Sequence, residues 1–225
     1  MAADPATSTP TSTAAATSTP TSNRSSGSIA DARRLAASAR ILLLARQLIM
    51  ERGLDVTMDE IAEGVGVGRR TLFRHFETRE RLLAAALEAG IQRYGELLPT
   101  FSGEWRTWLG ALCESAHRMQ AAYGPGYWEL TSRSDLAPDI AAVEDRRKIR
   151  RRQTMGRIAR TLWTEAGGTG DTPKRVSAAV GAHLSARFTA AVTVDVGQSW
   201  EVAAQLALAA IQSAVDDEVA ASRHA

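Results

Sequence analysis

Apolar residues recur at steps of three and four residues through most of the chain, a spacing that places them on one face of an α-helix. Between Asp31 and Gly53, where the first pattern ends, they are Leu35, Ala39, Leu42, Ile49 and Met50. From residue 104 onwards the same spacing predicts helices over 104–122, 126–133, 138–166, 173–195 and 199–221. No run alternates persuasively between apolar and polar residues, so we predict an all-α protein.

Two short helices are predicted between residues 57 and 76. Thr57 and Glu60 have the spacing of a capping box, so the first helix begins just after Thr57. Three glycines then interrupt the pattern, and the string RRTLFRHF, residues 69–76, forms the second helix. Two short helices joined by a glycine turn are typical of a helix-turn-helix, whose second helix enters the major groove of DNA.

A longer helix is predicted directly after this pair. Thr78 caps its start, and Pro99 ends it after about Leu98. The pattern therefore predicts an N-terminal unit of three helices over residues 29–80, which contains the helix-turn-helix. A larger helical unit follows over residues 81–225.

Residues 1–28 differ from the rest of the chain in composition. Ser, Thr, Pro and Ala dominate them, and the string ATSTPTS occurs twice. Because few large apolar side chains are present to offset the entropy lost on ordering, we predict a disordered tail. Arg24, Arg33 and Arg34 allow a second interpretation, in which a flexible arm contacts a phosphate backbone.

Composition narrows the class of protein. The 225 residues carry a net charge of +2, so affinity for nucleic acid has to come from a local patch. A single cysteine excludes an intramolecular disulfide and favours a reducing compartment. With no long apolar run and no signal-peptide pattern, we expect a cytoplasmic protein without a membrane partner. The histidine spacing and the lack of a phosphate-binding loop predict no metal, no cofactor and no enzymatic activity.

The helix over 69–76 is predicted to have separate core and outer faces. At about 100° per residue, Leu72 and Phe76 share one face and close a small core. Arg70, Phe73 and Arg74 lie on another face, where arginine can bridge guanine O6 and N7 and an aromatic ring can contact a thymine methyl group. The alternative is a solvated basic surface. The separation of the two faces favours contact with DNA bases.

Other residues near this helix are suited to the phosphate backbone. Thr71, His75 and Arg79 can hydrogen-bond phosphate oxygens, contacts that fix the position of the protein without reading sequence. The complete set of expected DNA contacts is Thr57, Arg69, Arg70, Thr71, Phe73, Arg74, His75 and Arg79.

An ordered set of motifs spans residues 41–83, ILLLARQLIMERGLDVTMDEIAEGVGVGRRTLFRHFETRERLL. It contains a helix ending in ERG, the pattern T..EIA...GV, the string TLFRHF and then RERLL. With these motifs, residues 35–85 resemble the DNA-binding domain of the TetR family of one-component bacterial regulators. The resemblance implies a C-terminal domain that binds a small molecule and forms a homodimer. That part resembles the family only in being helical and in ending with two long helices joined by VDVGQSWEVA.

Four positions depart from the family's pattern. Phe73 stands where the family usually has tyrosine, so a hydroxyl that commonly meets a phosphate is lost. Gly68 replaces a polar cap, Arg70 fills a position that is often small, and Arg79 replaces a common lysine. We therefore expect Arg70 to supply a base contact that many relatives lack.

The C-terminal unit is expected to hold a dimer interface and a ligand site. Val202 and Leu206 lie on a different face of the last helix from Leu208 and Ile211, so this helix needs two apolar partners, one of which can be a second subunit. The alternative is burial within a larger monomeric core. Candidate ligand contacts are the aromatic and polar residues Trp105, Trp108, His117, Tyr123, Tyr127, Trp128 and Trp163.

The resulting hypothesis is a repressor that binds a palindromic operator in double-stranded DNA as a homodimer through its last two helices, and that leaves it when an unknown small molecule binds. The alternative is a helical ligand-binding or adaptor protein with a vestigial DNA-binding domain. The basic run RRKIRRR, residues 146–152, is interpreted as a solvated helix face, with a second phosphate-binding surface as the alternative.

Overall fold

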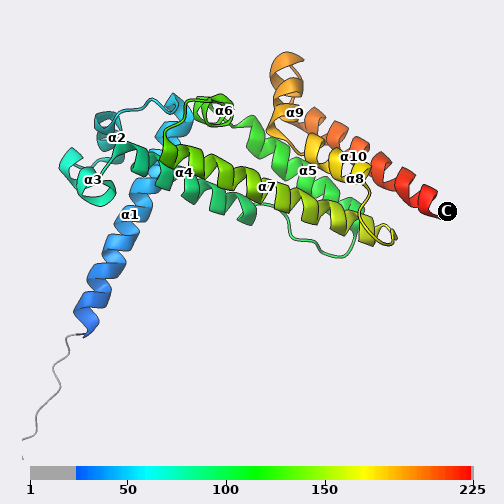
Figure 1. Ribbon diagram of the computed structural model, residues 1–225, viewed down its shortest axis with the longest axis horizontal. Helices are drawn as coiled ribbons and strands as arrows, with labels where there is room; N and C mark the ends of the chain where they lie inside the picture. Colours follow the sequence, from blue (N-terminus) through cyan, green and yellow to red (C-terminus); the bar gives the residue numbers. More distant parts are fainter. Residues whose placement is uncertain (1–23, 224–225) are drawn as a thin grey trace, which may run out of the picture. The chain divides into compact units, whose positions relative to one another are not determined.

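The computed structural model describes residues 24–223, and all regular elements among these residues are helical (Figure 1). This confirms the predicted all-α fold class. The chain divides between Ala37 and Ser38 into two compact units. The elements are α1 (Arg24–Arg52), α2 (Met58–Val65), α3 (Arg69–Phe76), α4 (Arg79–Glu96), α5 (Trp105–Ala121), α6 (Pro125–Ser132), α7 (Pro138–Glu165), α8 (Lys174–His183), α9 (Ala186–Ala190), a π-helical segment (Ala191–Asp195) and α10 (Trp200–Ser222).

The first helix begins earlier than the sequence predicts. Residues 24–28, which the composition predicts to be part of a disordered tail, belong to α1. Once a helix has formed, adding a residue to its end requires no new nucleus, so even a segment rich in serine can extend it. The remainder of the predicted tail, residues 1–23, lies outside the described residues.

The single helix predicted over 173–195 is wrong, because the chain breaks it between α8 and α9. Ser185 caps α9, since its hydroxyl accepts a hydrogen bond from the Phe188 amide at 3.1 Å. The Leu184 carbonyl, released by the break, accepts hydrogen bonds from the Gln120 side chain at 3.2 Å and from the Arg151 guanidinium at 3.3 Å. The last five residues, Ala191–Asp195, are π-helical.

One hydrophobic core lies beneath the helix-turn-helix. Ile49 of α1, Ile61 of α2, Leu72 of α3 and Leu82 of α4 are fully buried in it. Residues of α6 and α7 complete the same core, namely Leu130, Ile140 and Val143. The packing of the N-terminal helices therefore continues past residue 80 into the C-terminal helices.

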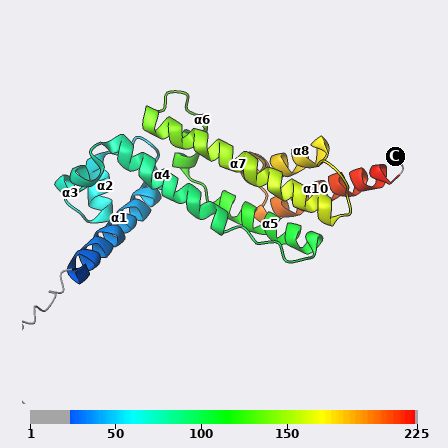
Figure 2. The same cartoon turned by 60° about the horizontal axis from the view of Figure 1, so that its bottom comes forward.

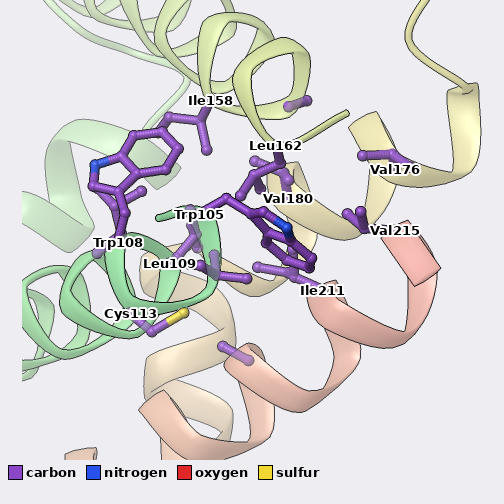
Figure 3. Close-up of a cluster of buried hydrophobic side chains, with 14 of the residues drawn as sticks. Trp105, Trp108, Leu109, Cys113, Ile158, Leu162, Val176, Val180, Ile211 and Val215 are labelled. Atoms are coloured by element: carbon purple, nitrogen blue, oxygen red, sulfur yellow. The ribbon is translucent and has the colours of Figure 1, made fainter. Parts of the chain in front are cut away.

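A second core lies among α5, α7, α8 and α10 (Figure 3). Trp105, Trp108 and Cys113 of α5 pack there with Leu162 of α7 and Ile211 of α10. Burial raises the pKa of the Cys113 thiol to about 12. Within residues 24–223, no helix is long and apolar enough to span a lipid bilayer.

Two ion pairs join α4 to α7, which lie side by side (Figures 1 and 2). The Glu88 carboxylate of α4 accepts hydrogen bonds from Arg146 at 2.9 Å and from Arg150 at 3.0 Å. Arg151 instead donates to the Gly181 carbonyl at 2.7 Å. The basic run over 146–152 is therefore partly occupied by contacts within the fold, which differs from a purely solvated face.

The end of α1 is held by α6. Gly126 lies so close to the Ile49 carbonyl that no side chain would fit there, and Gly124 meets Met50 in the same way. Beyond α1, the Glu129 carboxylate accepts a hydrogen bond from the Leu54 amide at 2.6 Å. The turn that leads into the helix-turn-helix is therefore positioned by a helix of the C-terminal part.

Candidate nucleic-acid interface

Local sequence fixes both ends of α2. The Thr57 hydroxyl accepts a hydrogen bond from the Glu60 amide at 3.2 Å, and the Glu60 carboxylate accepts one from the Thr57 amide at 2.7 Å, which confirms the predicted capping box. Gly66 ends the helix with φ = 69°, a backbone conformation in which glycine is unstrained. Thr57, a predicted DNA contact, is exposed but already engaged in this cap.

The predicted core face of α3 is confirmed. Leu72 is fully buried, and Phe76 and Val67 are half-buried against the same core. On the outer face, Arg70, Arg74 and His75 are exposed, and Phe73 is 38% exposed although it is apolar. Thr71 is half-buried on the flank of the helix.

The outer face of α3 carries two arginines, Arg70 and Arg74, that have no partner among the described residues. Among the side chains that the structure describes, neither Arg70 nor Arg74 has an ion-pair or hydrogen-bond partner. Both are therefore available to an anionic or hydrogen-bonding partner. Exposure of the apolar Phe73 ring to water is unfavourable. The ring and the two neighbouring arginines nevertheless match the mixed polar and apolar edge that base pairs present in the major groove.

Arg69 is positioned differently from Arg70 and Arg74. One of its terminal nitrogens lies 2.8 Å and 3.0 Å from the two carboxylate oxygens of Asp59, which ties α3 to α2. Its guanidinium also lies over the Phe73 ring, 5.4 Å from the centroid. Arg69 therefore orients the exposed ring, a role that the sequence did not reveal.

Arg79 forms a structural contact in place of the free side chain that the sequence suggests. Its Nε donates to the Val56 carbonyl at 2.6 Å, and a terminal nitrogen donates to the Leu54 carbonyl. A further nitrogen pairs with Glu80 at 3.1 Å. Because these partners occupy the guanidinium within the fold, Arg79 holds the turn between α1 and α2, and these contacts compete with the predicted contact to a phosphate.

A tight turn sets the direction of α4 relative to α3. Glu77 has φ = 61° and ψ = −51°, and the Thr78 amide donates to the Phe76 carbonyl at 2.6 Å. This is a γ-turn of the rare, strained kind. The exposed side chain of Glu77 pairs with Arg81, one turn into α4.

The seven predicted ligand contacts do not form one site. Trp105, Trp108 and Trp163 are buried in the second core. The Trp108 indole donates to the Pro99 carbonyl at 2.9 Å. The Trp163 indole nitrogen is buried without a partner among the described residues.

The remaining aromatic candidates gather around α6. The Tyr123 and Tyr127 rings stack with centroids 4.1 Å apart, and Trp128 meets the Tyr127 ring edge to face at 5.1 Å. The Arg147 guanidinium lies 5.6 Å from the Tyr127 centroid and is paired with buried Glu144. This cluster is separate from the tryptophans of the second core.

His117 belongs to a buried polar network between α5 and α9. The Gln120 amide group donates to the Leu184 carbonyl, so its oxygen is left to accept the Thr189 hydroxyl proton at 2.6 Å. Thr189 Oγ1 then accepts from His117 Nδ1 at 2.8 Å, which leaves Nε2 as a buried acceptor with no partner among the described residues. Burial, and to a smaller extent the nearby His183, lowers the pKa of His117 to about 4.

The sequence gave no indication of a hollow between α5 and α10. A cavity of about 290 Å³ lies between α5 and α10, and none of the seven candidates lines it. Its walls include Glu114, Trp200, Glu201 and Gln205. Trp200 lies far along the chain from the aromatic cluster between residues 105 and 163, so clustering in sequence gave no signal for it.

The comparisons with known proteins agree with this architecture. Residues 41–86 match the family model described as bacterial regulatory proteins, tetR family. A search of curated proteins found none with significant sequence similarity to the chain.

Solved structures share the fold over most of the chain. A proposed transcriptional regulator from Pseudomonas aeruginosa PAO1 has a TM-score of 0.61 at 17% identity, over 80% of this chain and 90% of that one. A proposed transcriptional regulator from Saccharomonospora viridis, solved in complex with choline, has a TM-score of 0.60 at 24% identity. The match covers 79% of this chain and 96% of that one. A TetR-family transcriptional regulator from Streptomyces coelicolor has a TM-score of 0.59 at 19% identity, and the match covers 87% of this chain and 96% of that one. Residues 41–86 are therefore similar to the N-terminal part of bacterial regulatory proteins of the tetR family, and the chain as a whole shares the fold of these solved structures.

Proposed function

We propose that the protein is a transcriptional repressor that binds a palindromic operator as a homodimer and leaves it when a small molecule binds the C-terminal helices. The observation that carries the proposal is the outer face of α3, where exposed Phe73 lies between Arg70 and Arg74 and neither arginine has a partner within the described residues. The proposed base contacts are these three residues. Thr71 and His75 are the proposed phosphate contacts.

The homodimer rests on the outward faces of α8 and α10. These two helices pack together, and each exposes small uncharged residues, such as Ala178 and Ala182 on α8 and Ala209 on α10. Leu206 of α10 is 50% exposed on the same side as Ala209. Exposed apolar residues on two adjacent helices fit a second copy, which would complete a four-helix bundle around a two-fold axis.

Release from the operator requires a ligand that favours a different conformation. Two recognition helices have to meet successive major grooves about 34–36 Å apart, so a small change in their separation weakens both contacts together. The ion pairs of Glu88 with α7, and the hold of Glu129 on the turn after α1, connect the helix-turn-helix to the C-terminal helices. A shift of α6 or α7 would therefore reach α1 and α4. The choline complex of the Saccharomonospora structure supports ligand binding in this fold.

The DNA-binding face is tested by alanine substitutions measured by footprinting and gel mobility shift on the DNA upstream of the protein's own gene. Arg70→Ala or Arg74→Ala should each cost about 1–3 kcal/mol at the operator, with a smaller loss on unrelated DNA, so that sequence preference relaxes. The matched control is Arg160→Ala, which removes an exposed arginine of α7.

Two outcomes would contradict the proposal. Unchanged operator binding in both variants would show that the recognition face is wrong. A wild-type protein that retards no duplex DNA would favour the alternative function, a ligand-binding or adaptor protein.

A further inference from the structure

The hollow between α5 and α10 is lined by an unusual combination of side chains. Glu114 comes from α5, and Trp200, Glu201, Gln205 and Leu208 come from the first turns of α10. At about 290 Å³, its volume lies near the lower limit of small-molecule pockets, which are roughly 300–1,000 Å³. The hollow therefore suits a small ligand.

The charge in this hollow is negative and unbalanced. Within the described residues, neither Glu114 nor Glu201 forms an ion pair, and no arginine or lysine lines the walls. A hydrogen bond from the Ser199 side chain, followed by one from its own backbone amide, lowers the pKa of Glu201, so this carboxyl stays ionised at neutral pH. Glu114 and Glu201 are both exposed residues of the lining, and two carboxylates beside one hollow repel anions and attract a cation.

The apolar part of the lining decides which kind of cation fits. Trp200, half-buried at the start of α10, and Leu208 offer surfaces that a hydrated metal ion could not use. An alkylated ammonium ion has a positive charge spread over apolar groups, so it can contact an indole face by a cation–π interaction while carboxylates balance its charge. Gln205 adds an amide that can hydrogen-bond a polar substituent.

We propose that the hollow between α5 and α10 binds a small organic ammonium ion, held by Trp200 and by the carboxylates of Glu114 and Glu201. The assignment of this ion as the effector rests on the proposed function, whereas binding itself does not. The site lies outside the helix-turn-helix, so ligand binding and DNA binding can be measured separately.

The test is a calorimetric titration of the full chain, without DNA, with tetramethylammonium chloride. Tert-butanol, a neutral molecule of similar shape, is titrated in parallel. We expect tetramethylammonium to bind and tert-butanol to bind at least about tenfold more weakly, because only the cation gains from the carboxylates and the indole. Absence of tetramethylammonium binding at millimolar concentration, or equal binding of the two molecules, would overturn the proposal.

Substitutions then identify the site. Glu114→Gln and Glu201→Gln should each weaken tetramethylammonium binding by about threefold to tenfold, and Trp200→Leu by about tenfold. Glu165→Gln, which removes an exposed carboxylate at the end of α7, is the matched control and should bind as the wild type does. Circular dichroism confirms that each variant is folded. Wild-type affinity in both glutamine variants would place the ion elsewhere and refute the site.

A mobility shift with and without tetramethylammonium separates this proposal from the proposed function. Binding of the ion without any effect on a retarded operator complex would retain the site and reject its assignment to the effector. Failure of the protein to bind DNA at all would reject the proposed function and leave the calorimetric result unaffected.

Discussion

Single side chains of the helix-turn-helix have roles that residue type alone does not reveal. Arg69, Arg70, Arg74 and Arg79 look equivalent in sequence, yet two have partners within the fold and two have none among the described residues. Arginine is suited to both tasks, because its planar guanidinium can satisfy backbone carbonyls as well as phosphates or guanine. The partner, and not the charge, therefore decides which arginines are available to DNA.

Replacing Arg79 with methionine tests its structural role. Arg79→Met should lower the free energy of unfolding by about 2 kcal/mol, because charge-assisted hydrogen bonds to two backbone carbonyls are lost. The salt dependence of DNA binding should stay unchanged, since no phosphate contact is removed. Urea denaturation and salt-dependent mobility shifts measure the two quantities. Arg81→Met, which removes only an exposed pair with Glu77, is the control. A salt slope reduced by about one, with unaltered stability, would restore Arg79 to the phosphate contacts.

Buried His117 predicts a specific loss of stability in acid. Its pKa is lowered to about 4 in the folded chain, against an ordinary value of 6.5, so the unfolded chain takes up a proton first as the pH falls below 6.5. The stabilisation is complete above pH 6.5 and is lost on the way down to about pH 4, which amounts to about 2 kcal/mol between pH 7 and pH 5.

The variant His117→Gln should lack this component of the pH dependence. Glutamine can still donate to Thr189 through its amide group, and it does not titrate. Urea denaturation at pH 7 and pH 5 measures the difference between wild type and variant. If both lost the same stability on acidification, His117 would not be the group responsible.

At the scale of the helices, periodicity and capping signals predict well that a helix is present, but they predict less well where each helix begins and ends. The boundaries of α2 and α3 follow from Thr57, Glu60 and the glycine turn, which are local signals. The break between α8 and α9 could not be predicted, because Val180 and Leu184 continue the apolar spacing through it and its stability comes from Gln120 and Arg151, which are distant in sequence. The γ-turn at Glu77 could not be predicted either, because the residue with positive φ is not a glycine.

A candidate ligand site is also difficult to predict from local sequence patterns. The aromatic residues between positions 105 and 163 suggest ligand contacts, and three of them, Trp105, Trp108 and Trp163, lie in the second core. The hollow between α5 and α10 joins residues about ninety positions apart in sequence, from Glu114 to Gln205. Only the packing of two helices that are distant in sequence creates it, so no local pattern could reveal it.

For the whole molecule, the two hydrophobic cores share helix α7, which contributes Ile140 and Val143 to the first and Ile158 and Leu162 to the second. The helix-turn-helix is therefore not an independent domain with a core of its own. Its core is completed by helices that also support the C-terminal part, so a rearrangement there alters the packing beneath α3, the proposed recognition helix.

The proposed homodimer is testable at this scale. Leu206→Glu should convert the dimer to a monomer, because the substitution buries an unpaired charge in the bundle. Sedimentation velocity at micromolar concentration measures the change, and operator affinity should fall with it. Glu218→Gln, which alters charge elsewhere on α10, is the control. A monomeric wild type, or an unaltered dimer in the Leu206 variant, would contradict the interface.

The single cysteine of the chain, Cys113, is enclosed by the second core and its thiol is held in the protonated form at neutral pH. Thiol reagents attack the thiolate, so this cysteine is chemically silent while the protein is folded. A cysteine introduced on the outer face of α3 can therefore receive a spectroscopic probe selectively, with Cys113 left in place. In the proposed dimer, the separation of two such probes would report directly on whether a ligand changes the spacing of the two α3 helices.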